Sequence, residues 1–144
     1  RINFIEHFLR ATEKPGQILV FNTLMEKGIL FKMMNDFPQY KKQILERINR
    51  IIDVEIPLKE LHLYHPAQQG SFSLKAIGNA LLGIDEFAKS NVKDGEEAMA
   101  VYNELFYWEN KEEVSQKLQQ LKTYCHTDTL VLYKIFEKLK ELIK

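Results

Sequence analysis

Near the C-terminus, the stretch YCHTD places four side chains that can do chemistry within five residues: Tyr124, Cys125, His126 and Asp128. A cysteine next to a histidine suggests a nucleophile with its base, or a pair of metal ligands. In a helix, however, adjacent side chains diverge by roughly 100 degrees, which places Cys125 and His126 badly for pairing. We therefore interpret Cys125 as a core residue and His126 as a surface residue. Tyr124 and Asp128 are four residues apart and share one side of the helix.

Asp128 interrupts the apolar stripe of this C-terminal segment. The stripe alternates spacings of four and three residues through Val114, Leu118, Leu121, Cys125, Asp128, Leu132, Ile135, Leu139 and Leu142. An unpaired carboxylate buried in such a stripe costs several kcal/mol, so it requires a cation, hydrogen-bond donors or a helix end. Two interpretations stay open. Either Thr127 or Asp128 caps a second helix, or Asp128 is a metal ligand within reach of the Tyr124 hydroxyl.

A second acidic residue follows the apolar run QILVF, which has the composition of a buried strand. Asn22 and Glu26 lie four residues apart where a helix should begin, and the carboxyl end of a strand is a common position for functional groups. The residues from Thr23 to Glu26 also match the S/T-x-x-E capping box. From this stretch alone we favour the capping interpretation.

The remaining pattern predicts a mostly α (α+β) chain of several helices with one to three short strands. Residues 51–64 look extended, with Pro57 as an interruption, and residues 65–71 look like a loop. Ser73 is a predicted N-cap, Gly83 a predicted helix end, and Asp94 opens another helix that reaches about Asn110. The other helices are expected over residues 2–12, 23–35, from Pro38 onward, and over 111–143.

Composition sets few limits on function. Lys and Arg total 20 and Asp and Glu total 20, so net charge provides no argument for nucleic acid as a partner. No apolar run approaches the ~18 residues that a membrane span needs, and we expect no membrane partner. Cys125 is the only cysteine, which excludes an internal disulfide and fits the reducing cytoplasm.

Taken in order, VFNTLME, RIIDV, HPAQQGSFSLK, DGEEAMAVYNEL and YCHTDT resemble the second half of a DEDD-type 3′–5′ exonuclease domain on the RNase H-like fold. The similar variant carries Tyr-x3-Asp in its last motif. An uncharacterised bacterial family with HP…GSxSLK, DG…EAM…Y and YCxxDT is the most similar. The resemblance extends from about Phe4 to Leu139, and the order of the motifs carries more weight than any one of them.

This resemblance implies a two-metal site for Mg²⁺ or Mn²⁺, held by four carboxylates, that cleaves nucleic acid. Glu26 and Asp128 match two of the metal-binding acids, Tyr124 the tyrosine that orients water, and Asn22 the polar residue before the second acid. Three further residues are expected to contact nucleic acid: Lys75, Ser71 and Ser73.

The chain also departs from the exonuclease pattern. Glu26 stands where an aspartate is usual, and Met25 where an aromatic residue is usual. The first motif, Asp-x-Glu on the opening strand, is expected upstream of Arg1. The Asp53-Val54-Glu55 sequence comes too late in the chain, and we interpret it as structural. We therefore expect residues 1–144 to be a single partial domain, inactive by itself, whose exposed strand edge allows self-association.

Two alternatives compete with the nuclease interpretation. The regular stripe of residues 114–142 could be the binding face of a non-enzymatic helical interaction domain, although packing within the domain explains the same stripe. The ligand types also allow a zinc site, but the spacing is unusual for one; its members would be His62, His65, Cys125 and His126. The aromatic residues 106–108 could stack bases, but we expect them to be buried at a helix end.

Overall fold

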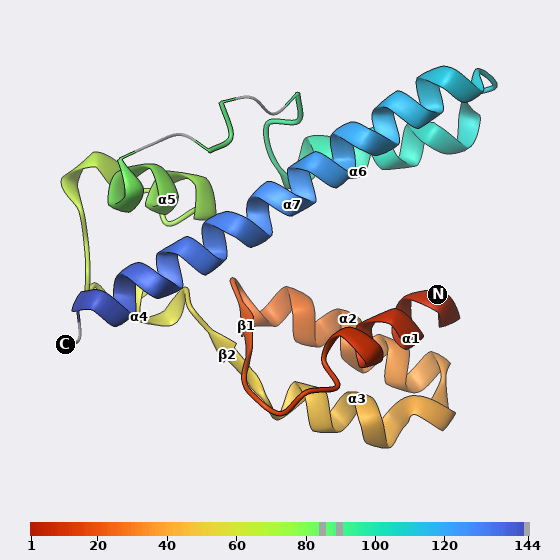
Figure 1. The fold of residues 1–144 in the computed structure, drawn as a ribbon, viewed down its shortest axis with the longest axis horizontal. Helices are drawn as coiled ribbons and strands as arrows, with labels where there is room; N and C mark the ends of the chain where they lie inside the picture. Colours follow the sequence, from red (N-terminus) through yellow and green to blue (C-terminus); the bar gives the residue numbers. More distant parts are fainter. Residues whose placement is uncertain (84–85, 89–90, 143–144) are drawn as a thin grey trace. The chain divides into compact units, whose positions relative to one another are not determined.

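The computed structural model describes residues 1–83, 86–88 and 91–142. The chain divides into two compact units, Arg1–Leu63 and Tyr64–Lys144 (Figure 1). Helices make up most of the described residues, and the only strands among them are two short parallel ones. The predicted mostly α class is therefore confirmed.

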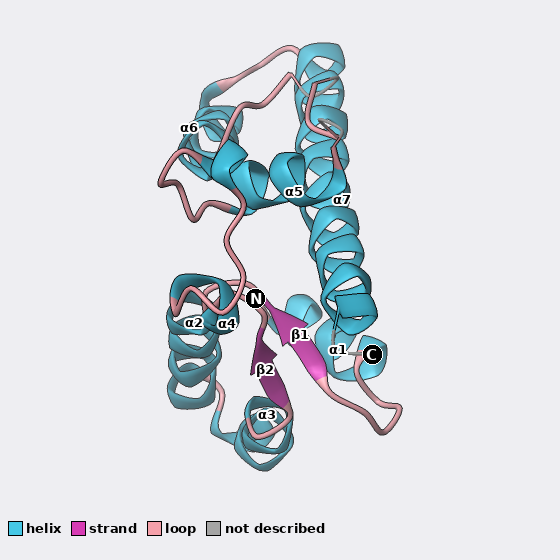
Figure 2. Cartoon of the chain, turned by 90° about the vertical axis from the view of Figure 1, so that its left-hand side faces the viewer, coloured by secondary structure: helices cyan, strands magenta, loops and turns pink. Residues whose placement is uncertain are grey.

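In the first unit, two strands and the helices between them alternate along the chain. Its elements are α1 (Ile2–Ala11), β1 (Ile18–Val20), α2 (Thr23–Asp36), η1 (Pro38–Tyr40), α3 (Lys41–Ile48), β2 (Ile51–Asp53) and α4 (Ile56–Lys59). The strands lie side by side, with Ile18 opposite Ile51 and Val20 opposite Asp53 (Figure 2). This register brings the end of β2 to the start of α2.

The core of the first unit forms between α1, α2 and α3. Its buried side chains are Ile5, Leu30, Met34, Ile44 and Ile48. Leu30 and Met34 lie four residues apart in α2, and Ile44 and Ile48 lie four apart in α3, so each pair shares one side of its helix. Full burial of an aliphatic side chain of this size contributes about 1.5–3 kcal/mol, so this cluster is the main stabilising element of the unit.

Arg50 stabilises the connection between α1 and β1 through hydrogen bonds to its backbone. Its guanidinium donates to the backbone carbonyls of Thr12, Lys14 and Gly16, at 2.9, 2.6 and 2.6 Å. Gly16 has a φ of 141°, which few residues other than glycine adopt. Arg50 thereby holds the loop that contains the KPG break beside the start of β2, and β1 follows this loop.

The prediction of an extended segment over 51–64 is wrong beyond Asp53. The short helix α4 begins at Ile56 with Pro57 in its first turn. Proline is favoured in the first turn of a helix because its fixed φ is helical and its missing N–H would have no partner there. The proline that was interpreted as an interruption of a strand instead helps to start a helix.

The second unit is built on one long helix, α7 (Lys111–Leu142), drawn in blue in Figure 1. It packs against α5 (Leu74–Leu82) and, nearer its N-terminus, against α6 (Gly95–Glu104). Two short 3-10 turns, η2 (Pro66–Gln68) and η3 (Leu105–Tyr107), complete the unit. No helix in the described part of the chain is both long and apolar enough to cross a membrane.

The contact between α5 and α7 depends on a glycine. A Cβ atom added to Gly78 would lie 2.6 Å from Cγ1 of Val131, so a larger residue would not fit without a shift. Ile77, Val131 and Ile135 are almost fully buried in this unit. The close approach of the two helices places the first turn of α5 near the middle of α7.

The predicted helix ends are largely confirmed. Ser73 caps α5 by accepting the Ala76 N–H at 3.2 Å, and Gly83 ends it with a φ of 70°. Asp94 caps α6 by accepting the Glu97 N–H at 2.9 Å.

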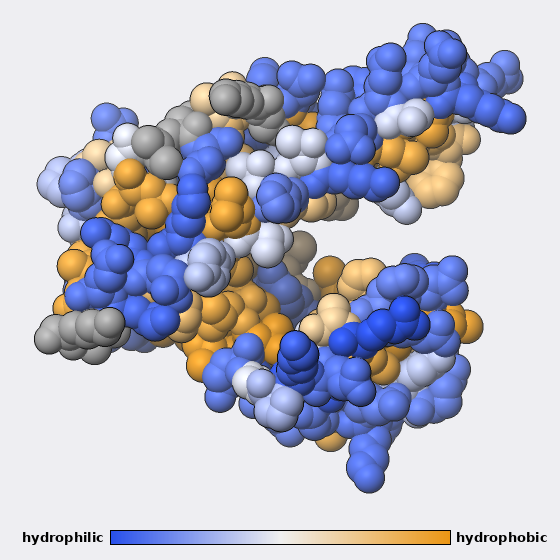
Figure 3. Space-filling model, viewed as in Figure 1, coloured by the Kyte–Doolittle hydropathy of each residue, from blue (hydrophilic) through white to orange (hydrophobic). Residues whose placement is uncertain are grey.

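The aromatic segment after α6 differs from the prediction. The α-helix stops at Glu104, before the expected Asn110, and η3 follows. Phe106 and Tyr107 are 72% and 86% exposed, so the expectation that they are buried is wrong. Figure 3 shows apolar surface at this end of α6, in the right-hand part of the view.

Candidate functional site

Tyr124 and Asp128 lie one turn apart in the middle of the unbroken helix α7. This continuity excludes the interpretation in which Thr127 or Asp128 caps a second helix. The Thr127 hydroxyl instead donates to the carbonyl of Thr123 at 3.0 Å, a bond that lets threonine remain within a helix. Asp128 is half-buried, and Val131 on the same side of α7 is fully buried. The acidic residue therefore does interrupt a buried stripe.

Tyr124 and Asp128 influence each other's protonation. Burial raises the pKa of the Asp128 carboxyl, and the hydrogen bond that it accepts from the Tyr124 hydroxyl offsets part of that increase. The pKa of Tyr124 is raised to about 12, first by burial and then by the charge of Asp128. At neutral pH the hydroxyl therefore keeps its proton and acts as a donor to the carboxylate.

A pocket of about 360 Å³ opens beside this pair, within the second unit. It is formed by the first turn of α5, the start of α6, the middle of α7 and Phe87. Its polar lining residues are Ser73, Lys75, Lys93, Asp94, Tyr124 and Asp128. The Phe87 ring is only 5% exposed, and its centroid lies 6.2 Å from that of the Tyr124 ring. The fold thus gathers charged side chains from distant parts of this unit around one concave surface.

Two of the three residues predicted to contact nucleic acid, Ser73 and Lys75, line this pocket. The third, Ser71, lies next to it, because its hydroxyl donates to Oγ of Ser73 at 3.3 Å. The Lys75 ammonium lies 5.8 Å from the centroid of the Phe87 ring, which is a cation–π contact. The structure therefore brings all three residues to the side of the second unit that carries Tyr124 and Asp128.

Lys93 and Phe87 belong to the pocket, although the sequence did not indicate them. Lys93 precedes the N-cap residue Asp94, and its backbone N–H donates to Oε2 of Glu97 at 2.6 Å. The DGEE pattern predicts where α6 begins and so locates Lys93 at a helix start. Only the packing of the unit brings that helix start beside α7.

The adjacent pair Cys125 and His126 does not take part in this pocket. Cys125 is exposed, so its interpretation as a core residue is wrong, because Tyr124 and Asp128 occupy the buried side of α7. His126 is exposed, as predicted. His65 accepts the Ala67 N–H at 3.2 Å and begins η2, which gives it a structural role. In the residues that the structure covers, no three His, Cys, Asp or Glu side chains are grouped to hold a metal ion.

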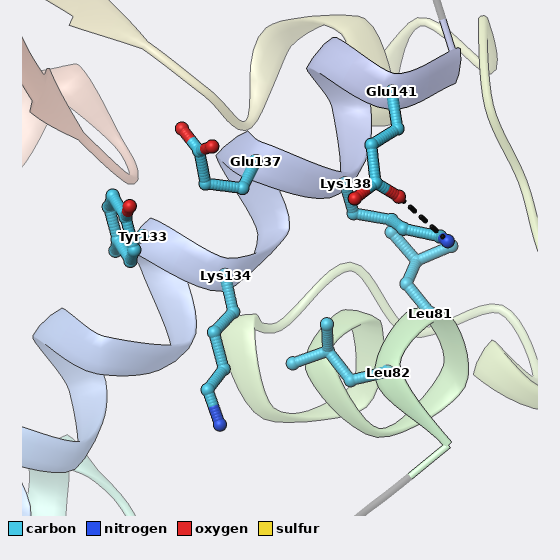
Figure 4. A pocket seen from close by; sticks show the side chains of 7 residues that line it. All are labelled: Leu81, Leu82, Tyr133, Lys134, Glu137, Lys138 and Glu141. Atoms are coloured by element: carbon cyan, nitrogen blue, oxygen red, sulfur yellow. Dashed lines mark hydrogen bonds and ion pairs between the residues drawn. The ribbon is translucent and has the colours of Figure 1, made fainter.

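A second pocket of this unit lies between the end of α5 and the C-terminal half of α7 (Figure 4). Leu81 and Leu82 face four charged residues of α7 there. Its lysines already have acidic partners: Lys134 pairs with Glu86, and Lys138 pairs with Glu141 at 3.1 Å. Ion pairs that are partly or fully exposed contribute little to stability and are common on helical surfaces, so we assign no function to this pocket.

In the first unit, Asn22 stands at the N-terminus of α2 with a φ of 76°. Asparagine tolerates this left-handed conformation better than most residues, which gives Asn22 a local structural role. The acceptor at this helix start comes from β2: Asp53 accepts the N–H groups of Asn22 and Thr23, at 3.2 and 2.7 Å, and that of Glu55 at 2.9 Å. The capping-box interpretation of Glu26 is therefore wrong, because Thr23 is already the first residue of the helix.

Asp53 and Glu55 both have the structural partners expected of them. Burial acts to raise the pKa of Asp53, but the hydrogen bonds from Thr23, Glu55 and Asn22 outweigh it and lower the pKa overall. Glu55 forms an ion pair with Lys59 at 2.9 Å, one turn along the chain. The late Asp-x-Glu sequence thus joins β2 to α2 and α4.

Glu26 lies in an unusual environment. It borders a pocket of about 140 Å³ whose other lining residues are apolar, among them Phe8, Val20 and Ile51. Its Oε2 atom is buried and is the only such side-chain atom without a hydrogen-bond partner in the described residues. Burial is the largest cause that raises the pKa of Glu26, and repulsion from Asp53 adds to it. Burying such a carboxylate oxygen without a cation or donor is unfavourable, and the described residues supply neither to it.

A family profile described as a domain of unknown function (DUF2779) matches residues 1–73. The chain belongs to this family. The DUF2779 match covers all of the first unit, including Asn22 and Glu26, and ends at the N-cap of α5; Tyr124 and Asp128 lie beyond it. Neither the curated proteins nor the solved structures contained a match.

Proposed function

We propose that this DUF2779 chain is part of a metal-dependent 3′–5′ exonuclease-like domain on an RNase H-like fold and acts on nucleic acid. The main support for this proposal is the tyrosine–carboxylate pair inside an unbroken helix, at the edge of a pocket with two lysines. The position of Asn22 and Glu26 directly after the first of two parallel strands supports the same assignment. The single cysteine fits a cytoplasmic location.

In this proposal, Asp128 and Glu26 hold Mg²⁺ or Mn²⁺, and the Tyr124 hydroxyl orients the attacking water. Both acids suit hard cations, which prefer oxygen ligands. Glu26 has an unpartnered buried oxygen, and Asp128 borders an open pocket. Such ions, when bound, activate the water and stabilise the leaving oxygen. Asn22, at the start of the helix that carries Glu26, positions that acid.

Of the four carboxylates that the resemblance implies, this chain carries only two, Glu26 and Asp128. Mg²⁺ needs near-octahedral oxygen coordination, so a half-site of two acids retains it weakly. We therefore propose that this chain binds the metal weakly and does not cleave nucleic acid by itself, whereas a protein with the full set of acids would.

The test combines metal binding with cleavage. We expect Mn²⁺ to broaden the amide NMR signals around residue 128 in the native chain but not in Asp128→Asn, while Tyr124→Phe still binds the metal. An exposed acid on the same helix, tested as Glu113→Gln, is the matched control. Labelled single-stranded DNA or RNA should stay intact with the native chain and Mn²⁺. Trimming that Asp128→Asn abolishes would refute the proposed inactivity, and no broadening at residue 128 would refute the metal site.

Self-association through the open strand edge is part of the same proposal. In the described residues, β2 is the only strand that pairs with β1. An unpaired edge beside exposed apolar residues is a template for a further strand, and Phe4 and Ile29 of this unit are 53% and 50% exposed. Light scattering should give a mass above the monomer value that falls when Leu19 is replaced by proline. A monomer at all concentrations would contradict it.

A non-enzymatic interaction domain remains the second candidate, because exposed apolar residues gather where α6 ends and α7 begins: Met99, Tyr102, Phe106, Tyr107 and Leu118. Within the 114–142 face, Leu118, Cys125 and Leu142 are exposed, whereas Leu121 and Ile135 are buried. If this candidate is correct, Leu118→Glu should abolish association without lowering thermal stability, whereas Ile135→Glu should unfold the unit.

A further inference from the structure

The charged groups of the Tyr124–Asp128 pocket differ from those of the pocket in Figure 4. Figure 4 shows Lys138 paired with Glu141, and the other lysine of that pocket, Lys134, pairs with Glu86. Lys75 and Lys93, by contrast, form no ion pair with any described residue, although both line the same pocket. Although Asp94 and Asp128 line the same pocket, neither lysine ammonium is in direct contact with a described carboxylate there, so both ammonium groups can pair with an anionic ligand.

The neighbouring structure limits where both lysines can reach. Lys75 lies in the first turn of α5, is half-buried, and holds its ammonium over the Phe87 ring. Lys93 is attached to the start of α6 through its own N–H and the cap formed by Asp94. Their backbones are therefore fixed by two different helices, while their ammonium groups stay available to a ligand.

The two aspartates of the pocket already have donors. Asp94 accepts the Glu97 N–H at 2.9 Å, and Asp128 accepts from the Tyr124 hydroxyl. Ser73 accepts from the Ala76 N–H and from the Ser71 hydroxyl, so its own hydroxyl proton is still available to donate. The ammonium groups of Lys75 and Lys93 and the Ser73 hydroxyl proton therefore remain as donors without an acceptor among the described residues, and these donors suit an anionic ligand.

We propose that this pocket binds the phosphate of a single nucleotide unit, with Lys75, Lys93 and the Ser73 hydroxyl as donors to the phosphate oxygens. The proposal rests on the proposed function for the source of the phosphate, and it adds Lys93 as a binding residue. Lysine binds phosphate as a point charge, and the N-termini of α5 and α6 border the same space. The volume of about 360 Å³ lies near the lower end of ligand pockets, so it suits one nucleotide unit and excludes a duplex.

The test is a titration of the whole chain with the phosphodiester dinucleotide of thymidine, in EDTA, followed by amide NMR shifts. We expect shifts at residues 73–75, 93–95 and 124–128. Lys75→Gln and Lys93→Gln should each weaken binding about fivefold to tenfold, as expected for the loss of one charge-assisted hydrogen bond. Lys93→Arg should retain binding. The control Lys122→Gln removes an exposed lysine of α7 that does not line the pocket and should change the affinity less than twofold.

Three results would overturn the inference: native affinity in Lys93→Gln, an equal loss in the Lys122→Gln control, or equal binding of free thymidine, which has no phosphate. Equal affinity for inorganic phosphate would overturn the nucleotide unit as the ligand. Lys93→Gln keeps the test valid even if Lys75→Gln fails to fold, because the Lys93 side chain is exposed. Because EDTA removes divalent metal, Asp128→Asn should bind the dinucleotide at least as tightly as the native chain. Failure of the metal site therefore remains distinguishable from failure of the phosphate site.

Discussion

Each unit of this DUF2779 chain carries a half-buried carboxylate on a helix, Glu26 on α2 and Asp128 on α7, and burial raises the pKa of both. Their surroundings differ. Glu26 borders an apolar pocket and has an oxygen without a partner, whereas Asp128 accepts from Tyr124 and opens onto a pocket of mixed charge. The Glu26 oxygen has no hydrogen-bond partner among the described residues, whereas Asp128 is part of a group of polar side chains.

Because their surroundings differ, we expect substitution of Glu26 to change stability and substitution of the partner of Asp128 to change the pKa of that acid. Removing the charge of Glu26 relieves an unfavourable burial, and a gain in stability there indicates that the acid is kept for function. Removing the Tyr124 hydroxyl should change the pKa of Asp128 and leave the helix α7 folded.

The largest effect on stability is expected at the contact between α5 and α7, which supports the Tyr124–Asp128 pocket. Gly78→Ala forces a shift against Val131 and should destabilise the second unit by about 1–3 kcal/mol. Trp108, the only tryptophan, reports on this unit in urea unfolding followed by fluorescence. Gly28→Ala in α2 meets nothing within 4 Å and should stabilise its unit by about 0.5–1 kcal/mol. An unchanged fluorescence midpoint in Gly78→Ala would contradict the close packing.

Next in size is the cap between strand and helix in the first unit. Asp53→Ala leaves three backbone N–H groups without their acceptor and should cost about 1–2 kcal/mol. The pKa of Asp53 is lowered in the folded chain, so its contribution is present above the ordinary value of 3.8 and is lost as the pH falls through the folded pKa.

Thermal unfolding at several pH values should therefore show the difference between native and Asp53→Ala shrinking toward low pH. Ser73→Ala removes an uncharged cap of the second unit and should cost about 1 kcal/mol at every pH. A pH-independent effect of Asp53→Ala would rule out the charged cap.

A smaller effect of opposite sign is expected at Glu26. Glu26→Leu removes the unpartnered carboxylate oxygen and should stabilise the first unit by roughly 0.5–1 kcal/mol at pH 7, since the group is only partly buried. The pKa of Glu26 is raised in the folded chain, so its own contribution is fully present below the ordinary value of 4.5 and is lost as the pH rises through the folded pKa.

The advantage of Glu26→Leu should accordingly disappear in acid, which urea unfolding at pH 4 and pH 7 measures. Glu13→Leu, at an exposed position of the same unit, is the control and should stay within about 0.5 kcal/mol of the native chain. A loss of stability in Glu26→Leu would mean that Glu26 already has a stabilising partner.

The smallest effect is a change in protonation at Asp128. Tyr124→Phe removes the hydrogen bond that lowers the pKa of the Asp128 carboxyl, so that pKa should rise. Carboxyl-carbon NMR titration measures it directly. Tyr133→Phe alters a tyrosine of α7 that is 56% exposed and should leave the pKa of Asp128 unchanged. An unchanged pKa of Asp128 in Tyr124→Phe would contradict the hydrogen bond between the two side chains.

Local sequence patterns were sufficient for the helix ends and most elements. The caps at Ser73 and Asp94, the glycine at Gly83 and the strand before Asn22 were all predicted correctly, because each depends on the conformational preferences of a few adjacent residues. The errors at Glu26 and Pro57 have the same origin. A short motif fitted a local rule, but Asp53 from another strand capped α2, and Pro57 began a helix.

Sequence patterns predicted only part of the candidate site. Spacing identified Tyr124 and Asp128, because residues four apart in a helix share a side whatever the helix packs against. Lys93 and Phe87 gave no such signal, since their proximity to α7 depends on how α5, α6 and α7 pack. Cys125 was misplaced because a 4,3 spacing fits two adjacent stripes, and only the contacts of α7 decide which one is buried.

The sequence by itself determined that the chain is mostly helical, where most helices begin and end, and that a tyrosine and an acid share one side of α7. These properties follow from backbone preferences and helical geometry over a few residues. The tertiary structure decided that Asp53 caps α2, that Glu26 keeps an unpartnered oxygen, and that two lysines border the Tyr124–Asp128 pocket. Such contacts join residues far apart in the chain, and they arise when apolar surfaces such as those around Gly78 and Ile44 are buried together.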